Sequence, residues 1–431
     1  MKKHRLLAIS AAVTLALTSL GAAVAETPAT PRVVVGQIAE VIRQGYFDPA
    51  QAEIIASAIV AEAQAGRYDA LTDPRDLQEA LTQRLKDYDR HFSVTAPQPA
   101  ADAPASAAPT LQPVPFPVGV ARRGQGFRAV EILPGNIGLV DMRMFIDFDG
   151  PEDAARKYAD AVLQLMSNTD AVIFDLRENG GGSPAMVGYL VSAFVGPDAD
   201  IYATFHSREG TESEAPAQPY AHPRLDVPVY VLTSGRSGSA AEAFAYTLQA
   251  ARRATIVGET SAGAANPGGP AITPSGYRIF VSNGTPINPI TKSNWEGVGV
   301  KPDVEAPAAQ ALDVAWQAAL ARQSDRLSGP VAVEAAWVLE ALRAPAALAL
   351  RAEDYVGDYS GSQVQSADGM LTWRSGRRPA WRLKPLSTDL FFDIDEPYRR
   401  VRFERDAGGR VTALETLDSQ VGGGRRLKRA D

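Results

Sequence analysis

A serine between a strand and a helix is the first candidate for chemistry. The apolar segment 227–233 is typical of a buried strand, and a short turn leads from it to Ser239, Ala240 and a helix that extends to about Ala251. At such a junction, backbone N–H groups and the positive helix end stabilise developing negative charge, and small neighbours let a substrate carbonyl approach. Ser239 is therefore either a nucleophile or simply the N-cap that serine favours.

Three consecutive glycines follow another apolar strand. Residues 171–176 predict this strand, and Gly180, Gly181 and Gly182 come shortly after it. Consecutive glycines adopt backbone conformations that other residues avoid, so their N–H groups can converge on an anion. The loop lacks the Gly-Lys-Ser/Thr ending of a nucleotide-binding loop. It either binds a negatively charged group of a ligand or forms a tight turn without one.

A serine nucleophile needs a base, and the sequence offers few. Of the four histidines, His4 lies near the N-terminus, while His206 and His222 flank a polar, proline-containing loop that predicts surface positions. His91, where a helical segment gives way to extended chain, is either the base or a partly buried structural histidine. No lysine follows Ser239 within 50 residues.

The sequence contains few histidines that could bind a metal and no cysteine that could act as a thiol. The absence of cysteine excludes disulfides, thiolate-bound zinc or iron–sulfur sites and a cysteine nucleophile. A metalloprotease helix motif with paired histidines is missing as well. We predict no metal site and no cofactor.

An alternation of strands and helices must position these residues. Between about 118 and 310, strands are predicted at 137–140, 171–176, 227–233 and 255–258, with helices between them. This pattern predicts an α/β fold with a largely parallel sheet covered on both faces, and ligands bind at the carboxyl ends of such strands.

Segments of different composition and predicted secondary structure flank this core. We predict five further segments: a signal peptide (1–25), an N-terminal helical domain (26–94), a Pro/Ala-rich linker or loop (95–117), a helical connector (311–350) and a C-terminal antiparallel β module (351–431). Asp48-Pro49 and Asp73-Pro74 each predict a capped helix start in the helical domain. Turns such as Asp368-Gly369 separate the strands of the β module. The Pro/Ala-rich segment could alternatively form a lid over a site.

The first 25 residues have the pattern of a secretory signal. Lys2, Lys3 and Arg5 precede an apolar stretch over 6–20, and Ala23-Val24-Ala25 predicts cleavage after Ala25. A membrane anchor is the alternative, although the apolar stretch is short for a span. No later segment is apolar enough to cross a bilayer. We therefore expect a periplasmic or secreted protein without a stable membrane span.

Composition and charge restrict the partners. The 431 residues, 45% apolar and 22% charged, indicate a globular protein of about three domains. Loss of three basic residues with the signal peptide changes the formal net charge from −7 to −10. An acidic protein is a poor candidate for binding nucleic acid or anionic lipid, because both require basic patches.

Six segments taken together resemble the C-terminal processing (tail-specific) serine peptidases, in the subfamily of the interphotoreceptor retinoid-binding protein modules and the tricorn protease core. They occur in the family's order over about residues 35–306: YDRHFSV, GNIGLVDMRMF, DLRENGGGSP, TSGRSGSAAEAFAY, VGETSAGAANPG and NWEGVGVKPDV. The resemblance implies a catalytic core of the ClpP/crotonase type and a polypeptide substrate.

The resemblance also implies roles for individual residues. Ser239 would be the nucleophile, and the N–H groups of Ala240 and Gly181 would form the oxyanion hole, with Gly180 and Gly182 beside the substrate. The branch that uses a Ser-Lys dyad carries lysine after Gly258-Glu259-Thr260, where this sequence has alanines. In the tricorn-like branch, the counterparts of His91 and Glu296 are the base and its supporting carboxylate.

This sequence departs from the family in two places. The residue before His91 is Arg90, where tricorn protease has a serine that links histidine to glutamate. Glu296 could therefore orient the imidazole directly, act through water or pair with Arg90. The PDZ domain common in the family would lie at 95–117, which is too short to hold one.

We predict a serine endopeptidase that hydrolyses exported proteins or peptides through a Ser/His/Glu site. The alternative is a non-catalytic protein that binds a lipid, a retinoid-like ligand or a peptide, and a third possibility is another hydrolase, such as an esterase, with the same triad.

Overall fold

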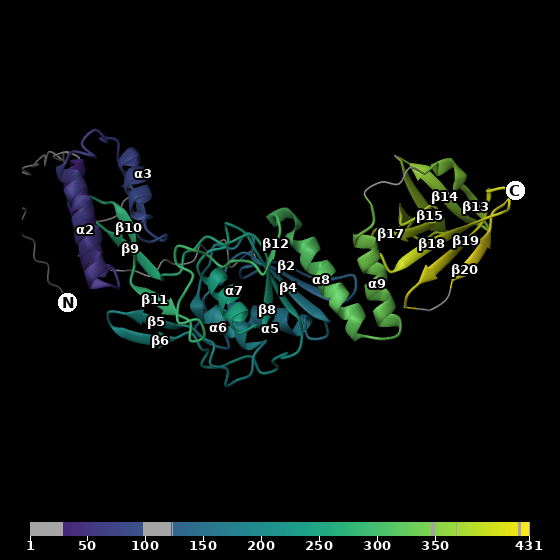
Figure 1. Cartoon of the computed structure of the whole chain (residues 1–431), viewed down its shortest axis with the longest axis horizontal. Helices are drawn as coiled ribbons and strands as arrows, with labels where there is room; N and C mark the ends of the chain where they lie inside the picture. Colours follow the sequence, from purple (N-terminus) through teal and green to yellow (C-terminus); the bar gives the residue numbers. More distant parts are fainter. Residues whose placement is uncertain are drawn as a thin grey trace, which may run out of the picture.

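Three structural units follow one another along the chain. The computed structural model describes residues 29–97, 122, 124–345, 350–367, 369–420 and 424–430. The predicted signal peptide, most of the predicted linker and Asp368 lie outside these ranges. Figure 1 shows a helical unit, a central sheet covered by helices, and a C-terminal β sheet. None of the helices in these ranges combines the length and the apolarity that a bilayer span requires.

Three helices build the N-terminal unit, and each begins with proline: α1 (Pro31–Gly45), α2 (Pro49–Gln64) and α3 (Pro74–Leu85). Asp48 accepts hydrogen bonds from two first-turn amides of α2, and Asp73 accepts one from α3. Both caps are those predicted from the Asp-Pro pairs.

A small sheet completes this unit with chain from the predicted core. β1 (Ser93–Thr95) pairs antiparallel with β10 (Arg278–Ser282), which pairs with β9 (Gly268–Ile272). Ile279 and Val281 of β10 are fully buried in the same hydrophobic core as the helices. The 268–282 hairpin therefore packs with the N-terminal helices, a long-range pairing that no local sequence pattern indicates.

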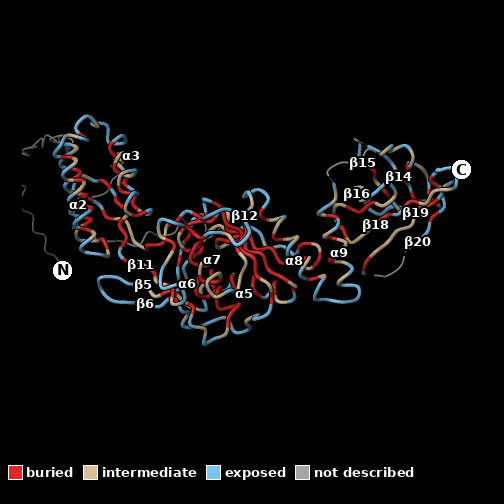
Figure 2. Tube along the Cα trace, viewed as in Figure 1, coloured by how far each residue is buried: buried red, intermediate tan, exposed pale blue. Residues whose placement is uncertain are grey.

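The central sheet has six strands in the order β12-β8-β7-β4-β3-β2, all parallel except β2. Their bounds are β2 (Phe127–Leu133), β3 (Ile137–Met142), β4 (Ala171–Asp175), β7 (Val229–Thr233), β8 (Ala254–Gly258) and β12 (Val304–Glu305). Every residue of β3, β4 and β7 is buried, which explains their continuous apolar sequences. Figure 2 shows a largely buried interior in this central unit.

Helices cover both faces of this sheet. Alternate residues of β4 face opposite ways: Val172 and Phe174 pack with α5 (Ala154–Leu165), α6 (Pro184–Ser192) and α7 (Ala240–Ala250). Ala171 and Ile173 pack with α8 (Ala311–Arg326) and α9 (Pro330–Leu342), which follow the short helix η1 (Ala308–Gln310). The α/β class predicted from the sequence is confirmed.

A second small sheet lies between the helical unit and the central sheet (Figure 1). It has the order β11-β5-β6, with β5 (Thr204–Ser207), β6 (Gly210–Ser213) and β11 (Gly284–Ile287). At the β5–β6 turn, Arg208 donates to the carbonyls of Tyr46 and Arg43 at 2.8 Å each. This hairpin is therefore tied to the end of α1.

The C-terminal unit is an antiparallel meander of eight strands, preceded by the short helix η2 (Ala352–Asp354). The strands are β13 (Gly357–Tyr359), β14 (Ser362–Ala367), β15 (Met370–Ser375), β16 (Trp381–Pro385), β17 (Leu390–Asp393), β18 (Arg399–Arg405), β19 (Val411–Asp418) and β20 (Arg425–Lys428). A bridge between Tyr359 and Arg429 joins its two ends, so the sheet is nearly a closed barrel. Arg400, which is buried, pairs with Glu340 on α9 at 2.8 Å. The predicted β module is confirmed as part of the fold.

Candidate active site

Ser239 lies where the turn after β7 enters α7, as the sequence predicts. Its backbone has φ +52° and ψ −119°, whereas an ordinary N-cap serine is extended. A left-handed φ costs a residue with a side chain about 1–3 kcal/mol and is found where structure holds it for function. A strained strand-to-helix turn of this kind exposes a nucleophile at the top of a sheet. The geometry therefore fits a nucleophile better than a simple cap.

A buried glutamate holds this turn in place. Glu242 Oε2 accepts hydrogen bonds from the amides of Ser239 (2.8 Å) and Ala264 (2.9 Å), and Oε1 accepts from the Ser261 hydroxyl (2.5 Å) and the Gly263 amide (2.7 Å). Burial raises the pKa of Glu242, and these hydrogen bonds oppose the rise. The sequence analysis did not assign Glu242 a role, although its spacing of three from Ser239 is that of a capping box.

Two further serines fasten the turn to the glycine loop. Ser237 Oγ donates to the Leu176 carbonyl at 2.7 Å, and Ser234 Oγ donates to the Arg177 carbonyl at 2.6 Å. The amide of Gly238 donates to the Asn179 carbonyl at 3.0 Å. The structure therefore brings the two sequence-predicted features together, since β4 and β7 are neighbouring parallel strands.

Gly181 is pressed against the nucleophile turn. A Cβ added to Gly181 would lie 2.7 Å from Ser239 Cβ and 3.1 Å from the Ala240 nitrogen, and its φ is +118°. Gly180 and Gly182 on either side are exposed. Only glycine fits at 181, because a side chain would meet both the steric and the conformational obstacle.

The two amides predicted to form the oxyanion hole differ in their hydrogen bonding. Ala240 is the first residue of α7, where an N–H has no intrahelical partner, and within the described residues it makes no hydrogen bond. The Gly181 amide donates instead to Asn179 Oδ1 at 2.9 Å. Asn179 is fully buried, and its Nδ2 donates to the Met142 carbonyl at 3.0 Å.

His91 immediately precedes Phe92 and β1 in the N-terminal unit. Its side chain is 16% exposed and stacks on Phe280, with ring centroids 5.6 Å apart. Nδ1 is buried and has no hydrogen-bond partner among the described residues. Burial lowers the pKa of His91, while nearby Asp89 opposes the shift. The imidazole is therefore neutral near pH 7, as a general base must be.

The carboxylate nearest to His91 Nδ1 was missed in the sequence analysis. Asp89 Oδ1 lies 3.8 Å from Nδ1 and accepts the His91 backbone N–H at 2.9 Å. Its Oδ2 accepts from Asn266 Nδ2 at 3.0 Å, and the side chain is buried. Its proximity in sequence, in Asp89-Arg90-His91, was the available signal.

Glu296 supports the histidine segment through the backbone. Its Oε1 accepts from the Arg90 amide at 3.0 Å, and its Oε2 accepts from the amides of Ala265 (2.6 Å) and Asn266 (3.2 Å). Burial raises the pKa of Glu296, and the Asp89 charge adds to this. Among the described side chains, no ion pair joins Arg90 to Glu296. Glu296 instead contacts the Arg90 backbone, an arrangement that was not among those expected from the sequence.

The segment 263–266 joins the two halves of the site. Its amides reach Glu242 behind Ser239 and Glu296 beside His91, as given above. Within the described part of the chain, however, no hydrogen bond joins Ser239 Oγ to His91. Candidate catalytic hydrogen bonds are often long without substrate and tighten when it binds.

Metal binding is a separate possibility for this cluster. Asp89, His91 and Glu296 have ligand atoms within 4.8 Å of one another. All four carboxylate oxygens already accept protein hydrogen bonds. A metal would have to replace those bonds, so the cluster is better suited to holding an imidazole. His206 and His222 are exposed, as predicted.

Comparison with known families bears on this site directly. Residues 136–306 match the sequence profile of peptidase family S41. Over this segment the chain is similar to family S41. It contains the glycine loop, Ser239 and Glu296, whereas His91 precedes it. The resemblance seen in the sequence is thereby confirmed for this segment.

Solved structures resemble parts of the chain around the S41 segment. A photosystem II D1 C-terminal processing protease is 21% identical, with a TM-score of 0.33, over 40% of this chain and 42% of that one. A candidate peptidase from Parabacteroides merdae is 17% identical, with a TM-score of 0.49, over 70% and 100%. Tricorn protease is 12% identical, with a TM-score of 0.40, over 66% and 35%. The match to the D1 protease thus spans less than half of that chain.

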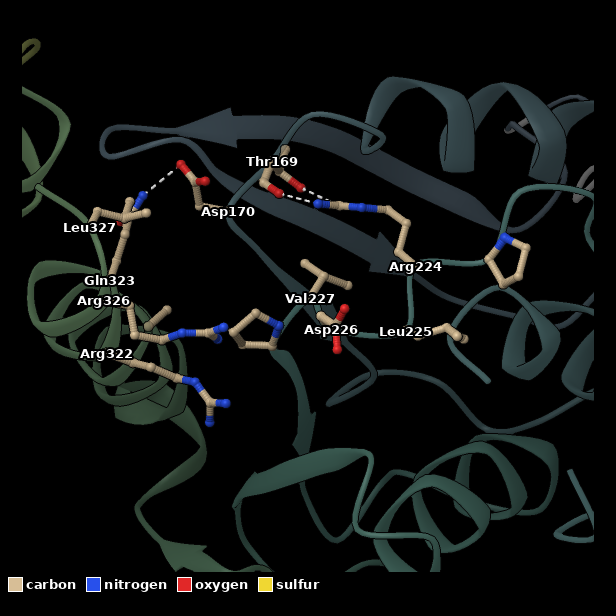
Figure 3. A pocket seen from close by; sticks show the side chains of 13 residues that line it. Thr169, Asp170, Arg224, Leu225, Asp226, Val227, Arg322, Gln323, Arg326 and Leu327 are labelled. Atoms are coloured by element: carbon tan, nitrogen blue, oxygen red, sulfur yellow. Dashed lines mark hydrogen bonds between the residues drawn. The ribbon is translucent and has the colours of Figure 1, made fainter. Parts of the chain in front are cut away.

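A cavity of about 560 Å³ lies at the amino ends of the central strands, away from the candidate active site (Figure 3). Its walls include Thr169 and Asp170 before β4, Val227 before β7, and Arg322 and Gln323 on α8. Ser239 and the glycine loop instead follow the carboxyl ends of β4 and β7. The cavity is thus separated from the S41 site by the length of the strands, roughly 17 Å.

Proposed function

We propose that this protein is a serine endopeptidase that hydrolyses peptide bonds in exported proteins or peptides. The observation that carries the proposal is the strained backbone of Ser239, held by Glu242 at the start of α7 and beside Gly181. The similarity to family S41 supports peptidase chemistry at this position. The amino-terminal pattern that resembles a signal peptide supports an exported location.

In the proposed reaction, neutral His91 takes the proton from Ser239 Oγ as Oγ attacks the substrate carbonyl carbon. The protonated imidazole then gives that proton to the departing amine, and an acyl-enzyme remains. In the second half, His91 activates water to release the acyl group. The depressed pKa of His91 supports this role, since the base must be unprotonated at the start.

Two carboxylates, those of Asp89 and Glu296, would support His91 in different ways. Asp89, 3.8 Å from Nδ1, stabilises the imidazolium and selects the tautomer with the proton on Nδ1. Glu296 acts as a positioning residue, because its contacts are to the backbone of Arg90, Ala265 and Asn266. We propose this division in place of a simple Ser/His/Glu triad.

The oxyanion would be stabilised by the N–H groups of Ala240 and Gly181. Gly181 must then exchange Asn179 Oδ1 for the substrate oxygen, which requires a rotation of the adjoining peptide. Gly180 and Gly182 give the loop the freedom for this and lie beside the bound substrate. Such donors typically contribute about 10²–10³-fold to the rate.

Hydrolysis of an unfolded protein tests the proposal. The mature enzyme is expected to cleave it, and Ser239→Ala should reduce kcat/KM on the order of 10³-fold or more. A fluorophosphonate probe should label Ser239 in the wild type alone. Equal cleavage by both proteins would refute the proposal.

A non-catalytic binding protein is the second candidate. The observation that favours it is the missing hydrogen bond between Ser239 and His91 in the described residues, together with the engaged Gly181 amide. An intact protein that resists the fluorophosphonate and retains an apolar or peptide ligand through purification would support this candidate.

A further inference from the structure

A cavity of about 1080 Å³ adjoins the candidate active site. On one side its wall contains Ser183 and Pro184, which directly follow the glycine loop, and on the other it contains Pro267, which directly follows Asn266. It continues along the hairpin β5–β6, the loop 147–151 and the carboxyl end of α1. We call it the acidic groove, for the reasons that follow.

Carboxylates dominate the groove. Five acidic residues line it, against two arginines: Asp147, Asp149, Glu209, Glu212 and Glu214, with Arg156 and Arg208. Asp149, Glu209 and Glu212 are exposed and, among the described residues, form no ion pair. Negative charge on the wall of a cleft raises the local concentration of cations.

Both arginines are already engaged elsewhere. Arg208 donates to the Tyr46 and Arg43 carbonyls. Arg156 lies 3.5 Å from the ring centroid of Tyr189 and 3.7 Å from Asp160. Neither arginine therefore neutralises the carboxylates across the groove.

Glu214 is the most unusual of the acidic residues. Its side chain is buried, the residue being 4% exposed, and both carboxylate oxygens lack a hydrogen-bond partner in the described part of the chain. Its backbone is fixed, because the amide donates to the Ala203 carbonyl at 2.9 Å and the carbonyl packs against Gly188 of α6, where a Cβ would lie 2.1 Å away. A buried polar group without a partner is costly, and one in a cleft is a candidate for ligand contact.

The neighbouring strand offers main-chain recognition. All four residues of β6 line the groove, and within the described sheets β6 pairs with β5 alone. An extended polypeptide can therefore hydrogen-bond to the outer edge of β6, while acidic residues select its side chains.

We infer that the acidic groove binds an extended segment of the polypeptide substrate that carries lysine or arginine side chains. The exposed Glu209 and Glu212 attract the cations, and Glu214 gives up its proton to solvent as it receives one of them at the base of the groove. The occupant's identity as substrate rests on the proposed function. The groove would thereby give the peptidase a preference for basic sequence near the scissile bond.

Binding to the full mature chain with Ser239→Ala tests this inference without hydrolysis. The probes are a fluorescein-labelled peptide of alternating lysine and valine and its counterpart with glutamine for lysine, followed by anisotropy. The lysine peptide is expected to bind about tenfold more tightly or better. Adding Glu214→Gln should remove most of that preference. Adding Glu209→Gln or Glu212→Gln should each reduce the preference by about two- to fivefold. The control is Glu131→Gln, an exposed change outside the groove, which should leave the preference intact.

Equal affinity for both peptides, or a preference that none of the groove variants changes, overturns the inference. If Glu214→Gln does not fold, the exposed Glu209→Gln and Glu212→Gln variants decide the matter. Failure of the proposed function is a separate result, since a wild type that hydrolyses nothing but prefers the lysine peptide refutes the peptidase and retains the groove. A wild type that cleaves basic and neutral peptides equally supports the peptidase and refutes the binding preference of the groove.

Discussion

Glu242 and Glu296 share four consecutive backbone amides between them. The amides of Gly263 and Ala264 donate to Glu242, and those of Ala265 and Asn266 donate to Glu296. One glutamate also holds the Ser239 amide, and the other holds the Arg90 amide. A single stretch of chain therefore fixes the distance between the proposed nucleophile turn and the proposed base.

Glu242→Gln should destabilise the protein. The new side-chain amide would place an N–H donor where only donors face it, so a buried network loses acceptors. We expect the free energy of unfolding to fall by about 2–4 kcal/mol, measured by urea denaturation. Glu259→Gln is the control, because Glu259 is exposed and, among the described residues, its side chain accepts a hydrogen bond from the Ala308 amide alone. Similar unfolding midpoints for the two variants would contradict the role assigned to Glu242.

Gly181→Ala should strongly reduce activity by displacing the turn that holds Ser239. The methyl group would lie 2.7 Å from Ser239 Cβ, at a φ that alanine avoids. We expect kcat/KM to fall on the order of 10²-fold or more, with a matching loss of fluorophosphonate labelling. Gly235→Ala in the same turn has open space around it and should stay within about twofold of wild type. The expectation fails if Gly181→Ala labels at the wild-type rate.

Asp89→Asn should shift the pH profile of kcat/KM. The His91 pKa is lowered by burial and partly restored by the Asp89 charge, so loss of that charge lowers the pKa further. Activity requires neutral His91, and the acid limb should therefore move to lower pH as the maximum rate falls. Asp87→Asn, at an exposed position nearby, should leave the limb in place. An acid limb that moves to higher pH would count against the Asp89–His91 interaction.

Glu214→Gln should remove a pH-dependent loss of stability. Burial raises the pKa of Glu214 from 4.5 to about 8. Between these values the folded state holds a proton that the unfolded state releases, so wild-type stability falls as pH rises, by up to about 1.4 kcal/mol per pH unit. Thermal unfolding at several pH values should show a shallower decline for Glu214→Gln. Parallel curves for the two proteins would mean that Glu214 ionises normally.

The sequence supported the local parts of this structure well. Strands and helices around Ser239 and the glycine loop were predictable, because fully buried strands have continuous apolar sequences and their ends carry glycine and serine. Asp48 and Asp73 marked their helices for similar local reasons. Each of these signals depends on residues within a few positions of one another.

Features that depend on contacts between distant residues could not be predicted from the sequence. The pairing of β10 with β1 joins residues almost two hundred positions apart, and no periodicity reports it. Asp89 was overlooked because a carboxylate two residues before a histidine is common, and its significance depends on the backbone direction at Arg90. Glu214 gave no signal either, since its burial depends on Gly188 and the β5–β6 hairpin rather than on its neighbours in sequence.

The β1–β10 pairing has a further consequence. His91 belongs to a segment that packs in the N-terminal core, while Ser239 leads into a helix of the central core. Neither folding unit contains the whole proposed site by itself, and the proposed chemistry depends on how the two units are docked. If the proposed function holds, heating that loosens the contact between the units would abolish activity before either core unfolds. Loss of activity would then measure the separation of the two units rather than their unfolding.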